Sequence, residues 1–280
     1  MTKHTLLALF LSAFIPVAQA APLSTQKISG LKMPESVVQA TDGRVFVSEI
    51  NGFGVDGDGQ ISVIEAGQVK LFAKGLAIIG QTLYVADNKR ILKLALSEPK
   101  QGQAEVFAAA TAFPVTPLFL NDLEADLAGN LYVSDSGDLK GKGGAVYQIN
   151  AQGQVRLLIN GQQDNRILAP NGLLMDDTGD VLMVVDFASG ILYSYNLATK
   201  QLLDIAVGFG GGDGVVHHAN GSMFVSDWKN GKVFRLDMNG EVTALAATYQ
   251  SAADIALTKD EKILMVPDMK AGELNFIVLP

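Results

Sequence analysis

The distribution of hydrophobic and polar residues along this chain predicts a repeated β-structure. One short phrase returns six times: an apolar residue, an aromatic or second aliphatic residue, Val, a spacer and an acid. The copies lie about 40–50 residues apart, a period typical of radial or stacked repeats. They are spelled VFVSE, LYVAD, LYVSD, LMVVD, MFVSD and LMVPD, and they end at Glu49, Asp87, Asp135, Asp186, Asp227 and Asp268.

Around each copy the chain divides into four short predicted strands. After the acid, apolar and polar side chains alternate with period two in segments such as GAVYQIN and GILYSYN, which indicates a strand. Gly, Asn or Asp punctuates the joins, as tight hairpins require. The last unit ends at Pro280 without a fourth strand, whereas a spare strand, QKISG, precedes the first unit.

An N-terminal strand that pairs with the last blade closes the repeats into a ring and protects the sheet edges. The sequence therefore predicts an all-β fold, a six-bladed β-propeller, as one domain over residues 21–280. A linear solenoid is the competing architecture. It needs capping units, which the sequence does not show.

Residues 1–20 are predicted to be a secretory signal peptide. Lys3 precedes an apolar stretch from Thr5 to Val17, and Ala18-Gln19-Ala20 forms a small-residue cleavage site. The stretch is short for a membrane span, so a retained anchor is the less favoured alternative. We therefore expect an exported protein, periplasmic or secreted, with no membrane association after signal cleavage.

The amino-acid composition excludes some kinds of active site and some kinds of partner. The chain has no cysteine, which excludes disulfides, thiol catalysis and zinc–thiolate sites. Its formal net charge is −8, and it lacks basic clusters, which argues against nucleic acid and anionic membranes as partners. An acidic chain is compatible with cation binding and with a small-molecule substrate. No feature of the sequence predicts the oligomeric state.

A second set of positions, which we call anchors, precedes the six acids by 13 to 15 residues. Equivalent positions before the innermost strands of a propeller converge at one end of the central axis. Four of the six carry a side-chain oxygen, which predicts a hard-cation site for Ca²⁺, with Mg²⁺, Mn²⁺ or Zn²⁺ as alternatives. Polar turn residues are the competing interpretation. The anchors are Glu35, Lys74, Asn121, Asn171, Asp213 and Ala253.

Other polar features have different interpretations. Because the six repeated acids recur in every unit, we expect them to be structural and to accept backbone N–H groups. His217 and His218 are neighbours on a predicted strand and point to opposite faces, so they cannot share one metal ion. The roles of these histidines and of Lys74 stay open. Trp228 is interpreted as either a packing residue or a ligand platform.

Four stretches at the anchors resemble one known family. In order, Pro34-Glu35-Ser36, Asn121-Asp122, Pro170-Asn171-Gly172-Leu173 and Gly212-Asp213-Gly214 are similar to the gluconolactonase/regucalcin-like family, the senescence-marker-protein group. The resemblance implies a six-bladed propeller that binds one divalent metal ion and typically hydrolyses lactones. It implies Glu35, Asn171 and Asp213 as metal ligands, Asn121 as a substrate-contacting residue and Asp213 as the acid/base.

The resulting hypothesis is a divalent-metal-dependent hydrolase of lactones or related esters, in which Asp213 takes a proton from an attacking water. Sugar-lactone members of the family often carry Arg two residues before the substrate-contacting Asn. Phe119 stands there in this chain, which argues against a hydrophilic sugar lactone and leaves a less polar lactone or another ester open. The alternative is a non-catalytic periplasmic binding or interaction propeller with a structural metal. A strictosidine-synthase-like propeller is a third hypothesis, on a fainter resemblance.

Overall fold

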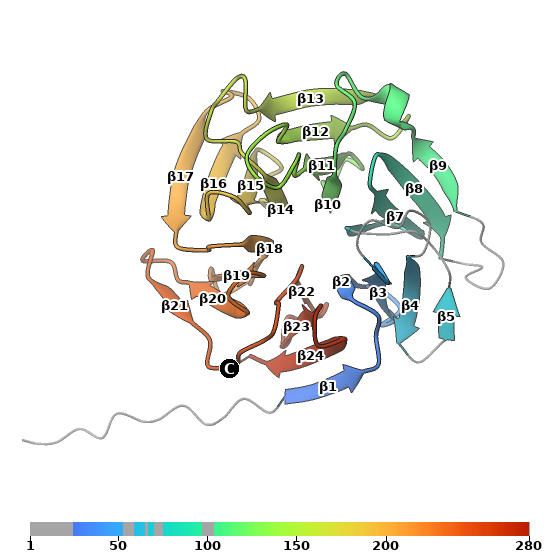
Figure 1. Cartoon of the computed structure of the whole chain (residues 1–280), viewed down its shortest axis with the longest axis vertical. Helices are drawn as coiled ribbons and strands as arrows, with labels where there is room; N and C mark the ends of the chain where they lie inside the picture. Colours follow the sequence, from blue (N-terminus) through green and yellow to red (C-terminus); the bar gives the residue numbers. More distant parts are fainter. Residues whose placement is uncertain (1–24, 53–58, 65–66, 70–74, 97–103, 280) are drawn as a thin grey trace, which may run out of the picture.

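The computed structural model describes residues 25–52, 59–64, 67–69, 75–96 and 104–279. The predicted signal peptide and the anchor Lys74 lie outside these residues. The described residues form six four-stranded antiparallel sheets, which are arranged as blades around a common centre (Figure 1). The predicted six-bladed β-propeller is confirmed.

Each blade runs from an innermost to an outermost strand. Blade 1 contains β2 (Pro34–Gln39), β3 (Val45–Glu49), β4 (Gln60–Ile64) and β5 (Gly67–Val69). Blade 2 contains β6 (Leu76–Ile79), β7 (Thr82–Asp87), β8 (Arg90–Ala95) and β9 (Glu105–Ala108). Blade 3 contains β10 (Leu120–Ala125), β11 (Leu131–Asp135), β12 (Ala145–Ile149) and β13 (Val155–Asn160).

The second half of the ring repeats this plan. Blade 4 contains β14 (Pro170–Met175), β15 (Val181–Asp186), β16 (Ile191–Asn196) and β17 (Leu202–Val207). Blade 5 contains β18 (Gly212–His217), β19 (Met223–Asp227), β20 (Lys232–Leu236) and β21 (Val242–Ala244). Blade 6 contains β22 (Ala256–Leu257), β23 (Ile263–Asp268), β24 (Glu273–Val278) and β1 (Thr25–Ser29).

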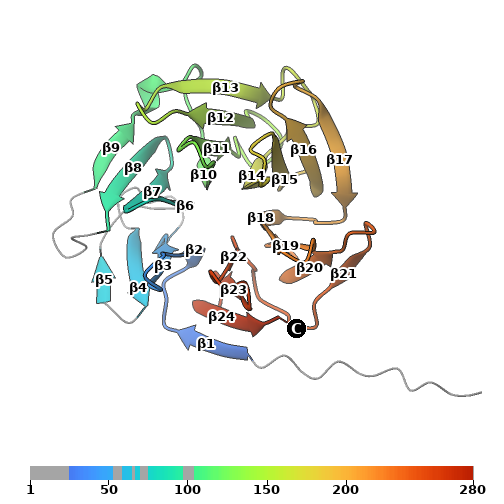
Figure 2. The ribbon, with the colours of Figure 1, turned by 180° about the vertical axis from the view of Figure 1, so that it is seen from behind.

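Pairing of the two ends of the chain closes the ring, as predicted. The outermost strand of blade 6 is β1, which pairs antiparallel with β24 from Thr25 opposite Ile277 to Ser29 opposite Glu273 (Figure 2). Lys27 Nζ lies 2.7 Å from a Glu273 carboxylate oxygen across this pair. The closure removes one exposed sheet edge from each end of the array.

The main hydrophobic core consists of six clusters, one between each pair of adjacent blades. Phe46 of blade 1 and Leu83 of blade 2, for example, belong to the same cluster, and both side chains are almost fully buried. The alternation of each blade's strands thus supplies apolar side chains to both neighbouring blades. Helix is limited in the described residues to one short 3-10 turn (Ala110–Ala112), and none of it is long or apolar enough to cross a membrane.

Candidate metal centre

Four of the six anchors lie in β-bulges at the start of an inner strand. In blade 3 the pairing shifts between Leu120 and Leu123, so that Asn121 and Asp122 together oppose the single residue Ser134. The same shift occurs at the anchors of blades 1, 4 and 5. A bulge changes the direction in which a side chain projects. These are the four blades whose anchors carry oxygen.

Serine at the spacer position of the repeated phrase holds three of the bulges. Its Oγ accepts a hydrogen bond from the backbone N–H of the residue after the anchor. This role was not predicted, although the V-S-acid spelling shared by the three blades was an available signal. The three bonds join Ser36 N to Ser48 at 2.9 Å, Asp122 N to Ser134 at 2.9 Å and Gly214 N to Ser226 at 2.8 Å.

In the described part of the chain, four of the repeated acids, Glu49, Asp135, Asp186 and Asp268, accept hydrogen bonds from backbone N–H groups of the loops that lead into the anchors, as their predicted structural role requires. Asp186 accepts hydrogen bonds from the backbone N–H groups of Leu168 and Ala169, just before the blade 4 anchor. Asp135 and Asp268 bind the corresponding loops of blades 3 and 6 in the same way. Each of these four acids therefore fixes the backbone that positions an anchor, without itself joining the candidate centre.

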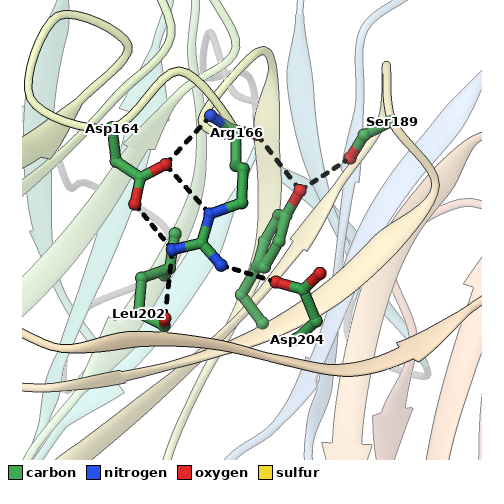
Figure 3. A network of polar contacts seen from close by, with 6 residues as sticks. Asp164, Arg166, Ser189, Leu202 and Asp204 are labelled. Carbon is green, nitrogen blue, oxygen red and sulfur yellow. Dashed lines mark hydrogen bonds and ion pairs between the residues drawn. The ribbon is translucent and has the colours of Figure 1, made fainter.

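The loop before Asn171 is also tied to the outer strand of its own blade (Figure 3). Arg166 in this loop forms ion pairs of 2.7 Å with Asp164 and with Asp204 of β17. Its guanidinium also donates to the backbone oxygen of Leu202 at 3.1 Å. The neighbouring Arg166 lowers the pKa of Asp164, so the pair stays charged at neutral pH. These contacts restrict the position of the backbone that carries the anchor.

Glu35, Asn171 and Asp213 come from three different blades, and the first two both act on the Asp213 carboxyl group. Their exposed fractions are only 6%, 3% and 4%. The Asn171 side chain hydrogen-bonds to the Asp213 carboxyl group, and the charge of Glu35 acts on the same group. Burial raises the pKa of Asp213 well above its usual value, and the nearby charges of Glu35 and Asp254 raise it further. Two buried, mutually repelling carboxylates favour a bound cation.

Two side-chain oxygens of this group are suited to bind a hard cation. Asn171 Oδ1 and Asp213 Oδ1 are buried and have no hydrogen-bond donor among the residues that the structure describes. Buried polar atoms are rarely left without a partner, and carboxylate and amide oxygens are the usual ligands of Ca²⁺. Within the described ranges no three His, Cys, Asp or Glu side chains gather as a metal cluster. The candidate centre combines two carboxylates with amide oxygen instead.

Asn121 occupies the anchor position of blade 3 and is linked to blade 4. Its Nδ2 donates to Ser136 Oγ at 3.1 Å, and Ser136 Oγ donates to the backbone oxygen of Pro170 at 2.8 Å. The amide is therefore held in one orientation at the blade interface. Ala253, the anchor of blade 6, offers no side-chain oxygen and packs in an apolar cluster with Met269.

The two histidines lie away from the candidate centre. His217 is exposed at the last position of β18, whereas Asp213 stands near the first position of the same strand. His218 follows that far end of the strand, where its Nδ1 accepts a hydrogen bond from Asn220 N at 3.0 Å. Neither residue is close enough to contribute a donor to the anchors.

A further set of carboxyl groups directly follows the anchors and was not predicted. Asp122 Oδ2 accepts a hydrogen bond from Leu173 N of blade 4 at 2.7 Å, and Asp254 Oδ2 accepts one from Ser36 Oγ of blade 1 at 2.6 Å. Each carboxyl thus connects two inner strands. Burial raises the pKa of both groups, that of Asp254 to about 7. Glu124 lies two residues further along β10, and burial raises its pKa to about 7 as well.

These raised pKa values predict that the metal-free protein is less stable at alkaline pH. Folded Glu124 keeps its proton to about pH 7, whereas the unfolded side chain loses it near pH 4.5. The contribution of this group to the free energy of unfolding is therefore fully present below pH 4.5 and is lost as the pH rises through about 7. We expect Glu124→Gln to make the decrease in unfolding free energy between acidic and alkaline pH smaller by on the order of 1–3 kcal/mol. Denaturant unfolding of chelated protein at acidic and mildly alkaline pH measures the change.

Burial also raises the pKa values of Asp122 and Asp254, so the variant should reduce the pH slope without abolishing it. Glu241→Gln, at an exposed position in blade 5, is the control and should leave the slope unchanged. Equal slopes in the wild type and in Glu124→Gln would contradict the prediction.

The fold and the candidate centre define the class of this protein: a six-bladed β-propeller with buried oxygen donors where its inner strands begin. Comparison with known families is consistent with that class. Residues 56–266 match the SMP-30/Gluconolactonase/LRE-like region. The chain belongs to this family, as the resemblance at the anchors predicted. No curated protein matches the chain.

Several solved structures share the fold. A gluconolactonase from Xanthomonas campestris is 17% identical, with 94% of this chain and 93% of that chain covered and a TM-score of 0.70. The calcium-binding protein regucalcin from Agrobacterium tumefaciens is 17% identical, with coverages of 88% and 90% and a TM-score of 0.68. Virginiamycin B lyase from Staphylococcus aureus is 12% identical, with coverages of 92% and 100% and a TM-score of 0.64. At these identities the similarity shows the fold alone.

Proposed function

We propose that this propeller is a divalent-metal-dependent hydrolase of lactones or related esters. The observation that carries the proposal is that Asn171 Oδ1 and Asp213 Oδ1 are buried without a hydrogen-bond donor among the described residues, in the same group as Glu35. Oxygen donors without His or Cys favour Ca²⁺, with Mg²⁺, Mn²⁺ and Zn²⁺ as alternatives. Family membership and the gluconolactonase and regucalcin neighbours support the same assignment.

When bound, a divalent cation supplies Lewis acidity toward an ester carbonyl and lowers the pKa of water. Glu35, Asn171 and Asp213 would hold it. The Asp213 carboxylate would also act as the general base that takes a proton from an attacking water. Asn121, held by Ser136, would orient the substrate through its amide. Ring opening by water needs no covalent bond to the protein.

Metal analysis combined with a lactone screen tests the proposal. We expect purified protein to contain about one equivalent of Ca²⁺ or another divalent ion, and to lose lactone hydrolysis after chelation and regain it on reloading. A cation whose dissociation constant lies about 10²–10³-fold below its free concentration also stabilises the fold by about 3–4 kcal/mol, which thermal unfolding reports.

Two outcomes would contradict the proposal. If chelated and metal-loaded samples hydrolyse the lactones equally, the reaction does not use the candidate centre. If the protein binds a cation and melts higher with it, yet opens no lactone or ester, the non-catalytic binding propeller is the correct description.

A further inference from the structure

A second circle of side chains stands beside the anchors. In blades 1, 3, 4, 5 and 6, the residue after the repeated acid donates its backbone N–H to the backbone oxygen of the residue two positions before the anchor. This bond places the residue at the same end of the blade as the anchor. Ser136 shows the resulting proximity, because its Oγ accepts a hydrogen bond from the Asn121 amide. The donors are Ile50, Ser136, Phe187, Trp228 and Met269, and the acceptors are Met33, Phe119, Ala169, Gly211 and Ser251.

Over blades 4, 5, 6 and 1 this circle is continuously apolar. We call Phe187, Trp228, Met269 and Ile50 the aromatic arc. The Phe187 and Trp228 ring centroids are 6.2 Å apart, and Trp228 Nε1 contacts Met269 Sδ at 3.3 Å. Met269, Ile50 and the anchor Ala253 form one cluster, against which Trp228 packs. Phe187 and Trp228 are only half-buried, so part of each ring stays accessible.

Two lysine side chains lie over the two rings of this arc. Lys229 Nζ is 4.2 Å from the Phe187 ring centroid, and Lys270 Nζ is 4.1 Å from that of Trp228. In the part of the chain that the structure describes, neither ammonium group has a carboxylate within ion-pair distance. In a chain of net charge −8, these two lysines place two ammonium groups beside the arc, and each can attract a negatively charged substituent.

We propose that the aromatic arc and its lysines select esters that carry an aromatic or other flat apolar group together with an anionic substituent. This inference depends on the proposed function and deepens it by naming the substrate class. The arc would bury the apolar group, and Lys229 and Lys270 would attract the negative charge. Phe119 at the neighbouring loop of blade 3 adds no hydrogen-bond donor for sugar hydroxyls. A polyhydroxylated lactone therefore gains little from this wall.

Paired substrates and intrinsic fluorescence test the proposal. The substrates are dihydrocoumarin, a carboxylated dihydrocoumarin, δ-valerolactone and glucono-δ-lactone, and we expect kcat/KM to be highest for the carboxylated aromatic lactone. Trp228 is the single tryptophan of the chain, so its emission reports binding without turnover. Titration with 3-phenylpropanoate should quench it saturably, and gluconate should not.

Variants separate the two features of the arc. Lys229→Gln with Lys270→Gln should remove the preference for the carboxylated lactone over its neutral partner, and Trp228→Phe should retain more of the aromatic preference than Trp228→Ala. In Trp228→Ala, we expect the kcat/KM ratio of dihydrocoumarin to δ-valerolactone to fall about 10-fold or more, the usual effect of losing one apolar contact surface. Lys200→Gln with Lys262→Gln, at exposed positions in blades 4 and 6, is the charge-matched control and should change neither ratio.

The outcomes distinguish this inference from the proposed function. Hydrolysis of δ-valerolactone with no aromatic or anionic preference overturns the inference and leaves the lactonase assignment standing. If no lactone is opened but 3-phenylpropanoate still quenches Trp228 selectively, the arc is a binding site and the assignment as a hydrolase falls. Equal quenching by gluconate and 3-phenylpropanoate overturns the inference whatever the activity.

Discussion

Asp213→Asn is expected to abolish lactone hydrolysis while the propeller stays folded. Asn has the same shape as Asp but cannot accept the proton of an attacking water, and it removes one of the two negative charges at the candidate centre. Loss of a general base alone typically lowers turnover by about 10²–10⁴-fold. The measurement is kcat/KM in metal-loaded protein, with circular dichroism to check the fold.

A second readout separates this result from simple unfolding. Because Asp213 and Glu35 repel each other without a cation, the variant should be at least as stable as the wild type after chelation. It should also lose most of the stabilisation that Ca²⁺ gives the wild type. Asp237→Asn, in a surface turn, is the control and should keep both activity and metal response. Activity of Asp213→Asn within a few-fold of wild type would remove Asp213 from the mechanism.

The blades were predictable because their signals are local. Strand alternation with period two and the valine-acid phrase repeat within each unit, so six copies reinforce one interpretation. The spare strand predicted at 26–30 is β1, Thr25–Ser29, one residue earlier. Its partner β24 lies at the other end of the chain. This long-range pairing was predictable only because the last repeat lacked a strand.

The details of the candidate centre were not predictable to the same extent, because they depend on contacts between blades. The bulge at Asn121 and Asp122 adds one residue against Ser134 and leaves no periodic trace in the sequence. The bond between Ser36 and Asp254 joins residues 218 positions apart, so neither position reveals its partner. The anchors were found because they share a register, whereas the carboxyl groups that follow them occur in only two blades.

Gly172→Ala is expected to cost both stability and activity, because the inner strands of neighbouring blades lie in tight backbone contact directly after the anchors. A Cβ atom at this position would lie 2.3 Å from the backbone oxygen of Asp213 and 2.8 Å from Gly214 Cα. These neighbours are backbone atoms of a strand held between two other blades, so they cannot move aside as a flexible side chain would. We expect a loss of about 2–4 kcal/mol, at or above the usual cost of overpacking, measured by denaturant unfolding.

Gly43→Ala separates the clash from backbone strain. Gly43 has a φ of +89°, and a Cβ atom added there would meet nothing within 4 Å, so alanine should cost only about 1 kcal/mol. If Gly172→Ala is no more destabilising than Gly43→Ala, the inner strands at Gly172 and Asp213 are not in the close contact described above. Activity provides the more sensitive test, because Asn171 and Asp213 flank the contact on both strands. A shift large enough to admit one methyl group also separates these two side chains, so kcat/KM should fall further than the folded fraction does.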